Sequence, residues 1–440
     1  MLTDFRDFED FLSRFTNYER IPSFKYDNKT LGLERLRALV AEIGNPQEDY
    51  PSVHIGGTKG KGSTSLMLEA LLLSAGYTVG TYTSPHVEHL RERIRIGGEP
   101  AGEDALLSEI NRLLPAIERR RKEDPTGFPS FFELMTALAM ASYRTHRIDW
   151  GVFEVGLGGR LDATNILSPR STAITSIGLE HTQQLGNTLR RVAREKAGII
   201  KPGTPVVLGP LPADAAEEIC RVAQERSAPL FPVDENLVKS AGAGNLSIAG
   251  HGVVPAGPVF GPALRLDLGI ALTLFQQVSS QQALDAEGKR LDTELIASAL
   301  SGLSLPARVE VFPLEPNVVV DSAHTSASIR ALCLSLAEIR FPEPRTLVFS
   351  LARGKEIPSI LEQLPEIADE IIFTQADPAR SLHPAALRDG LGRGDVVLEP
   401  TEALQEAIRR GHAVVVTGSF YLAGALRPLI REMALTNSER

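Results

Sequence analysis

Residues 53–65 read VHIGGTKGKGSTS, a short apolar strand that runs into a glycine-dense turn. A helix with several apolar residues is predicted over 64–74, directly after the turn. Glycine accepts positive φ without a Cβ clash, so such a turn can point its backbone N–H groups inward. The helix start adds unpaired N–H groups and the positive end of a dipole. Strand, turn and helix together predict a cradle for phosphate.

The lysines of this turn sharpen the prediction. Lys61 can reach the outer phosphates of a nucleotide as a mobile point charge. The next position, which usually holds magnesium through Ser or Thr, is Gly62. Either Ser63 takes over that role or another part of the chain holds the metal. A tight turn without a ligand is the alternative, but two lysines interleaved with so many glycines favour phosphate binding.

Length and composition set the class of protein. With 440 residues, 43% hydrophobic and 23% charged, the chain is expected to form two or three globular domains. The net charge of −9 argues against general nucleic-acid binding, and no apolar run reaches membrane-spanning length. The acidic N-terminus does not resemble a signal peptide. Cys220 and Cys333 are interpreted as buried thiols without a disulfide or zinc site. We therefore expect a cytoplasmic enzyme.

Strands and helices alternate along most of the chain, which predicts an α/β fold. Residues 1–304 are expected to form a P-loop-type domain with a mostly parallel sheet, which would bind a nucleotide through the glycine turn. Residues 305–440 are expected to form a smaller, Rossmann-like domain with right-handed crossovers. Residues 234–267 are rich in Gly, Ala and Pro and predict a loop-rich strand segment. Other strands are predicted at residues 53–55, 77–83, 152–155, 172–177, 205–208, 318–320, 347–349, 371–373, 396–398 and 414–416.

Polar side chains lie at the ends of several predicted strands, where open α/β sheets bind their ligands. Ser84, Glu154 and His181 occupy such positions in the first domain. A carboxylate in an apolar strand is costly unless it is paired or holds a cation, and either magnesium or Arg160 could neutralise Glu154. The phosphate loop favours magnesium. A plain turn at Ser84 and a hydrogen-bonded core histidine at His181 are the alternatives.

Three further residues invite a functional and a structural interpretation. Lys196 lies in the last turn of a predicted helix, where the helix dipole alone would stabilise a cation. Asp321 and His324 follow the first strand of the second domain, where they could bind a ligand or merely cap the next helix.

Six motifs, in this order, resemble the folylpolyglutamate synthase and dihydrofolate synthase family of the Mur ligase superfamily, and the resemblance covers nearly the whole chain. They are residues 57–63 (GTKGKGS), 83–86 (TSPH), 154–165 (EVGLGGRLDATN), 196–201 (KAGIIK), 321–324 (DSAH) and 416–419 (VTGS). The resemblance implies an ATP-dependent ligase that joins L-glutamate to a carboxylate of folate or dihydropteroate through an acyl phosphate. We expect a monomer that binds small molecules, not nucleic acid or membrane.

The resemblance also implies roles for individual residues. The phosphate contacts would come from the loop, namely Gly57, Thr58, Gly60, Lys61, Gly62 and Ser63. One magnesium would be bound by Ser84 and Glu154 and a second by Glu154 and His181. Lys196 matches a lysine that the family uses in carbamylated form, as an anion that supports the second metal. The catalytic set is then Lys61, Glu154, His181 and Lys196, while the second domain would contact nucleotide through Arg308, Asp321 and His324.

Several positions depart from the family pattern. Lys59 stands where Asn is commoner, and Glu180 stands before His181 where Asp is usual. Near the adenine the family shows His, Gln and Asn, whereas here Gln276 and Ser280 replace the His and the Asn. These changes leave open a Mur-type ligase with another carboxylate and amino acid, or a non-catalytic nucleotide-binding paralogue.

Overall fold

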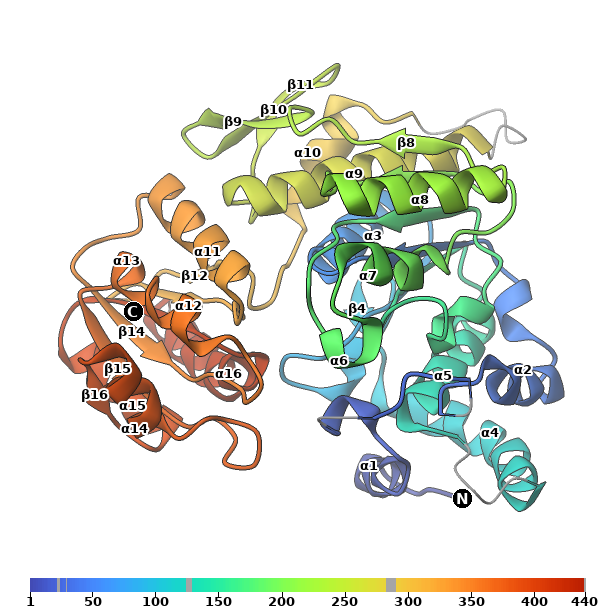
Figure 1. The fold of residues 1–440 in the computed structure, drawn as a ribbon, viewed down its shortest axis with the longest axis horizontal. Coiled ribbons are helices and arrows are strands. Elements are labelled where there is room, and N and C mark those ends of the chain that lie inside the picture. The colour runs from blue at the N-terminus through green and yellow to red at the C-terminus, as the bar shows by residue number, and fades with distance from the viewer. Residues whose placement is uncertain (22–23, 29, 124–128, 282–289, 439–440) are drawn as a thin grey trace. The chain divides into compact units, whose positions relative to one another are not determined.

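The computed structural model describes residues 1–21, 24–28, 30–123, 129–281 and 290–438. The chain forms two compact units, each with its own sheet (Figure 1). The first unit consists of Met1–Pro85, Arg91–Pro255 and Leu266–Leu303, and the second of His86–Leu90, Ala256–Arg265 and Ser304–Arg440. The second unit thus includes two short segments from within the first 304 residues.

An eight-stranded sheet forms the centre of the first unit, in the order β4-β3-β2-β5-β1-β6-β7-β8. Strands β2, β5, β1, β6, β7 and β8 run parallel, while β3 and β4 are antiparallel. The central strands β1 and β5 are buried at every residue, as expected for a sheet covered on both faces. The predicted mostly parallel sheet is confirmed. The bounds are β1 (Ser52–Gly56), β2 (Val79–Tyr82), β3 (Ile94–Ile96), β4 (Glu99–Pro100), β5 (Trp150–Glu154), β6 (Ser171–Ile174), β7 (Val206–Leu208) and β8 (Leu230–Pro232).

Helices of this unit pack on the sheet and on one another. Helix α5 starts with a capping box, in which Ser130 and Glu133 each accept a hydrogen bond from the other's backbone N–H. Helices α7 and α8 pack together over a core that includes Ile174, Val192 and Ile219. The helices are α1 (Phe5–Ser13), α2 (Leu33–Glu42), α3 (Lys61–Ser74), α4 (Glu103–Glu123), α5 (Phe131–Thr145), α6 (Thr182–Leu185), α7 (Leu189–Ala197), α8 (Ala213–Glu225) and α10 (Thr293–Ser301), with short 3₁₀ turns η1 (Tyr18–Arg20), η2 (Pro46–Glu48), η3 (Leu90–Arg93) and η4 (Ala163–Ile166).

The segment predicted to be rich in strands, residues 234–267, is only partly so. It contains an antiparallel sheet of β9 (Val238–Gly242), β10 (Asn245–Ile248) and β11 (Gly252–Pro255). Helix α9 (Gly261–Gln281) then begins inside it, so the strand character inferred from residues 264–266 is wrong. Leu264 and Leu266 alternate around a polar residue as in a strand, but α9 buries Leu264 together with Leu268, at helical spacing.

The second unit has a six-stranded sheet in the order β12-β13-β17-β14-β15-β16, parallel except for β12. The predicted mostly parallel sheet is therefore confirmed here too. Its core includes Val320, Val348, Ile372 and Val416. The elements are β12 (Glu310–Phe312), β13 (Val318–Val320), α11 (Ser326–Glu338), β14 (Arg345–Phe349), α12 (Ile357–Leu361), α13 (Leu364–Ile367), β15 (Glu370–Phe373), α14 (Pro384–Leu391), β16 (Asp395–Val396), α15 (Pro400–Arg409), β17 (Ala413–Thr417) and α16 (Phe420–Ser438).

The cysteines correct one prediction. Cys220 is exposed on α8 and Cys333 is half-buried on α11, so the expectation of two buried thiols is wrong. Helix α8 buries Ile219, and the next residue points about 100° further around the helix. No helix of the described residues is long and apolar enough to cross a membrane.

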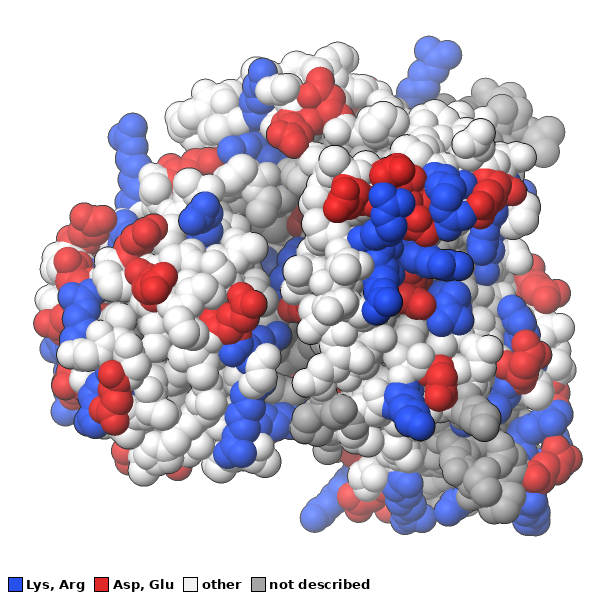
Figure 2. Space-filling view, in the orientation of Figure 1, with Lys and Arg blue, Asp and Glu red and all other residues white. Residues whose placement is uncertain are grey.

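Charged side chains of both signs lie together over α7 and α8 (Figure 2). Arg190 pairs with Glu217 at 2.6 Å, and Arg221 pairs with Glu218 at 2.6 Å. The arginines of this face are thus countered by neighbouring acids.

Candidate active site

The glycine loop after β1 has a backbone conformation that depends on glycine at two positions. Gly57 has φ +148° and Gly60 has φ +85°. A Cβ on Gly57 would lie 1.9 Å from Thr175 Oγ1, and one on Gly60 would lie 2.1 Å from Asp267 Oδ1. Both positions therefore need glycine, for conformation and for space. Helix α3 begins at Lys61, three residues before the predicted start, so the end of the loop is already its first turn.

The N–H groups in the first turn of α3 have no carbonyl partner within the helix, because no helical turn precedes them. Gly60 precedes this turn and provides no side-chain cap. The Lys61 ammonium is half-buried and donates to the Thr58 carbonyl at 3.4 Å, a long contact that a phosphate oxygen could displace. Ser63 is buried at 4% exposure. Thr58 itself is tied to the loop after β6, since its hydroxyl accepts from Gly178 N–H at 3.0 Å.

Glu154 ends β5 and is 4% exposed. Its Oε2 accepts the backbone N–H of Ser84, the residue predicted to share its metal, at 2.9 Å. The carboxylate faces the start of α3, because a Cβ on Gly62 would lie 3.5 Å from Oε2. Arg160, the alternative neutraliser, is exposed and pairs instead with Glu195 at 2.9 Å.

His181 lies in the same unit but is exposed. It adopts φ +52° and precedes the first turn of α6. Within the described ranges, no three or more His, Cys, Asp or Glu side chains form a group that could hold a metal ion. A site for Mg²⁺ does not need such a group, because Mg²⁺ is usually held by one or two carboxylates together with phosphate oxygens and water. Glu154 with the Ser84 hydroxyl fits that donor set.

Lys196 is brought to the phosphate loop. It lies in the last turn of α7, is 5% exposed, and donates to the carbonyl of Gly57 at 2.7 Å. Burial lowers the pKa of its amine to about 7, the positive charge of Lys61 acts in the same direction, and the Glu180 carboxylate opposes both. Stabilisation of an exposed cation by the helix dipole, the alternative interpretation, does not explain why Lys196 is buried against the loop. The amine is instead partly neutral at neutral pH.

The glycine-rich segment after β5 is held by a buried polar chain. His54 Nε2 lies 2.8 Å from Thr164 Oγ1, which bonds Asp162 Oδ1, and Asp162 Oδ2 accepts Leu157 N–H at 2.9 Å. Burial lowers the pKa of His54 to about 3, so its imidazole stays neutral. This chain explains why a histidine stands in an apolar strand beside the loop.

Two features of this unit were missed from the sequence. Asp267 of α9 is 8% exposed, and its carboxylate abuts Gly60. Its position among apolar residues was the available signal, since burial of a carboxylate is costly unless a partner compensates for it. The second feature is an ion pair between Lys59 and Glu180 at 2.8 Å.

Two of the predicted residues of the second unit, Arg308 and His324, lie against the ring of Phe420, for which the sequence offers no local signal. The Arg308 guanidinium lies 4.8 Å from the centre of the Phe420 ring, and the His324 ring lies 5.9 Å from it. Arg308 also donates to Ser322 Oγ at 2.6 Å. Asp321 is buried, and its two oxygens accept backbone N–H groups of Val309 and Ala323 at 2.9 and 2.7 Å.

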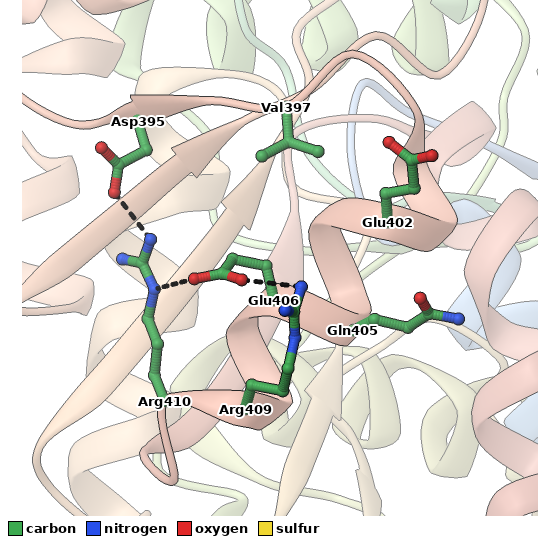
Figure 3. A pocket seen from close by; sticks show the side chains of 7 residues that line it. All are labelled: Asp395, Val397, Glu402, Gln405, Glu406, Arg409 and Arg410. Atoms are coloured by element: carbon green, nitrogen blue, oxygen red, sulfur yellow. Dashed lines mark hydrogen bonds and ion pairs between the residues drawn. The ribbon is translucent and has the colours of Figure 1, made fainter.

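A hollow beside β16 and α15 lies in the same unit (Figure 3). Arg410 crosses it and pairs with Asp395 at 2.6 Å and with Glu406 at 3.4 Å, while Arg409 also pairs with Glu406. These side chains form ion pairs with one another, so we do not assign this hollow a part in the expected ligase reaction.

Comparison with known proteins gives the family. The Mur ligase, glutamate ligase domain matches residues 307–420. Dihydrofolate synthase/folylpolyglutamate synthase of Bacillus subtilis is 31% identical over 419 residues, which cover 91% of this chain and 95% of that protein. The Escherichia coli protein of the same name is 29% identical and covers 91% of both chains.

Solved structures agree over the whole fold. Mycobacterium tuberculosis folylpolyglutamate synthase, complexed with ADP and AMPPCP, superposes with a TM-score of 0.82 at 28% identity, covering 92% of this chain and 96% of that one. An E. coli structure in complex with DHPP and ADP gives 0.80 at 28% identity and covers 98% of both. The chain therefore belongs to the folylpolyglutamate synthase/dihydrofolate synthase family, and it is an ATP-dependent ligase of the Mur type.

Proposed function

We propose that this chain joins L-glutamate to a carboxylate of folate or dihydropteroate, with ATP converted to ADP and phosphate. The observation that carries the proposal is the convergence of three groups on one glycine loop. Lys61 belongs to the loop, Lys196 donates to Gly57, and the Glu154 carboxylate faces the position of Gly62. The names of the relatives support the folate substrate class.

The reaction proceeds in two steps. A carboxylate oxygen of the folate attacks the γ-phosphorus, and the bond to the bridging oxygen of ADP breaks, which leaves an acyl phosphate. The glutamate amine then attacks the carbonyl carbon, loses a proton, and displaces phosphate. Phosphoryl transfer needs positioning and charge stabilisation more than a protein nucleophile. Lys61 and the N–H groups of the first turn of α3 supply both to the phosphates, together with the loop residues Gly57, Thr58, Gly60, Gly62 and Ser63.

Glu154 and Ser84 would hold one Mg²⁺, and Glu154 with His181 a second. When bound, the metal neutralises the negative charge that the phosphates carry and develop. The Ser84 N–H bond to Glu154 holds the carboxylate next to Ser84, the other residue proposed to bind this metal. This arrangement accounts for Gly62, since the oxygen ligands come from other strand ends.

Lys196 is proposed to carry a carbamate. Its neutral amine can add to carbon dioxide: an N–C bond forms, one C=O π bond becomes a carboxylate C–O⁻, and one proton is released. Counted from the ammonium form, which loses a further proton first, an anion replaces a cation. That anion would support the second metal. Arg308 and His324 are proposed to contact the nucleotide through their side chains. Asp321 would act by holding their loop, since both of its oxygens accept backbone N–H groups. We also propose that the protein acts as a cytoplasmic monomer.

The test is ADP release by the purified protein over a panel of dihydropteroate, reduced folates and other carboxylates, each with glutamate or another amino acid. We expect release only with a pteroate or folate together with glutamate. Lys61→Ala should lower turnover by about 10³-fold, while Lys239→Ala, an exposed lysine of β9, should not. A panel without folate-dependent release would refute the substrate, and a near-normal Lys61→Ala would refute the phosphate role.

A further inference from the structure

Two residues noted for departing from the family pattern turn out to be partners. Lys59 lies in the phosphate loop and Glu180 in the loop after β6, 121 residues later. Lys59 Nζ donates to Glu180 Oε1 at 2.8 Å, and the two side chains are 36% and 16% exposed. The pair therefore lies at the edge of the site, half shielded from water.

The backbone of Lys59 faces the same loop as its side chain. Its N–H donates to Ser176 Oγ at 2.8 Å, and its carbonyl accepts from Thr175 Oγ1 at 2.5 Å and from Ser176 Oγ at 3.0 Å. Thr58 adds a bond from its N–H to the Ser176 carbonyl at 2.8 Å. The backbone of residues 58 and 59 is thus tied to the end of β6.

On the other side of the contact, the chain from Gly178 to His181 has fixed ends. Gly178 N–H donates to the Thr58 hydroxyl, and His181 accepts the first bonds of α6 through its carbonyl. Leu185 of α6 is buried in the core of the unit. Between these ends, Leu179 is 58% exposed, and His181 holds a left-handed conformation that is uncommon for a residue with a side chain. The Lys59 ammonium forms an ion pair with Glu180, in the middle of this segment.

We propose that Lys59 and Glu180 are a positioning pair, which fixes the turn from Gly178 to His181 against the phosphate loop and thereby sets His181 for metal binding. Neither residue needs to touch the nucleotide. The inference rests on the metal role proposed for His181. It adds an ion pair that connects the segment from Gly178 to His181 with the phosphate loop.

Neutral variants of matched shape separate this role from a simple effect of charge. Removing the Lys59 cation should strengthen binding of a nearby divalent cation if only through-space charge matters, whereas removing the Glu180 anion should weaken it. Their double variant would then bind like the wild type. A positioning pair predicts instead that Lys59→Met and Glu180→Gln weaken metal binding alike, and that the double variant is no worse than either one.

The experiment is a Mn²⁺ titration of the full chain with saturating AMPPCP, with free Mn²⁺ measured by its electron paramagnetic resonance signal. We expect each single variant and the double to weaken Mn²⁺ binding by about fivefold, in line with a partly exposed pair. Lys59→Arg, which keeps the pair, should bind within twofold of the wild type. Opposite shifts in the two single variants, or shifts that multiply in the double, would overturn the proposal.

His181→Ala distinguishes the metal role of His181 from the positioning role of the Lys59–Glu180 pair. If it weakens Mn²⁺ binding while Lys59→Met and Glu180→Gln do not, His181 keeps its metal role and the positioning pair is refuted. If His181→Ala leaves Mn²⁺ binding unchanged, the metal role itself is wrong. Thermal unfolding of each variant checks that the fold is retained, and an unfolded Lys59→Met would be replaced by Lys59→Gln, which must show the same fivefold loss.

Discussion

Two buried acids, one in each unit, lie at the carboxyl end of a strand and are used differently. Glu154 ends β5 at 4% exposure, and Asp321 follows β13 at 8% exposure. Asp321 accepts two backbone N–H groups, from Val309 and Ala323, and so folds two loops together. Glu154 accepts the N–H of Ser84 and faces the start of α3. A buried carboxylate at a strand end therefore does not by itself indicate a ligand site. Its hydrogen-bond partners distinguish a structural role from a ligand-binding one.

Two cations, one in each unit, differ in the same way. Lys196 is buried against the Gly57 carbonyl, and the pKa of its amine is lowered to about 7 by burial. Arg308 is stacked on Phe420 and hydrogen-bonded to Ser322. The first unit thus brings groups whose charge can change next to a phosphate cradle. The second holds a permanent cation in a fixed plane, as suits recognition of a nucleotide.

Glu154→Gln should give the largest effect. The amide keeps an oxygen for the Ser84 N–H but loses the charge, so we expect turnover to fall by about 10³-fold. The free energy of unfolding should stay equal or rise, because a buried charge is removed. ADP release and urea unfolding measure the two quantities. Glu225→Gln, an exposed acid of α8, is the control and should change neither. Lost stability with retained turnover would make Glu154 a structural acid like Asp321.

Lys196→Ala should cost about 10²-fold in turnover and be partly restored by small carboxylates, if a carbamate acts there. Only the neutral amine adds to carbon dioxide, so wild-type turnover should rise with pH through about 7 and level off above it. The folded pKa lies below the usual 10.5, so between these values the unfolded chain binds more protons. The contribution of Lys196 to stability therefore increases with pH in that window.

The modification itself can be observed directly. With ¹³C-labelled carbon dioxide, the wild type should show a carbamate resonance that Lys196→Ala lacks and that Lys239→Ala keeps. A wild type without that resonance, and with a flat pH profile, would leave Lys196 as a plain hydrogen-bond donor to the loop.

Asp321→Asn tests the other half of the comparison. The NH2 group of Asn would replace one carboxylate oxygen and would face a backbone N–H, so that two donors meet without an acceptor. We therefore expect the free energy of unfolding to fall by about 1–3 kcal/mol. Turnover at saturating ATP should fall less than about tenfold, since no direct contact is removed. Urea unfolding followed by circular dichroism, together with ADP release, gives both numbers. Normal stability with abolished turnover would show that Asp321 binds the nucleotide directly.

Local signals explain what could be predicted from the sequence. The apolar run of β1, the glycines at 57 and 60, and the acid at 154 each act within a few residues, and they led to the sheet and the phosphate loop. Contacts between distant segments carry no such signal. The pairing of Lys59 with Glu180 and the approach of Asp267 to Gly60 arise only when β6 and α9 are placed beside β1.

Amphipathic stretches were the other source of error. Leu264 and Leu266 alternate as in a strand, but they belong to α9, and apolar residues continue after them. A helix that is buried on nearly every side has little polar face, so its sequence does not show the helical period clearly. Cys220 was interpreted from its apolar neighbours alone. Its exposure follows from its angle on α8, which the buried stripe of that helix determines.

Phe420→Leu should give the smallest effect and probes the fixed cation of the second unit. Leucine fills similar space but removes the aromatic face beneath Arg308, a contact worth about 0.5–1 kcal/mol at a partly exposed site. We expect the KM for ATP to rise by about three- to fivefold with kcat unchanged, as for an interaction that acts equally on bound substrate and transition state. Steady-state kinetics with ATP varied gives this split.

The neighbouring residue provides a matched control for that variant. Tyr421→Leu removes the contact with Arg380, at 4.7 Å, from the same helix start and leaves the Arg308 stack in place. It should leave the KM for ATP unaltered. If both variants raise the KM equally, the start of α16 acts as a whole and Arg308 has no special part in nucleotide recognition. If only Phe420→Leu does, the stacked arginine of the second unit is the counterpart of the mobile Lys61 in the first.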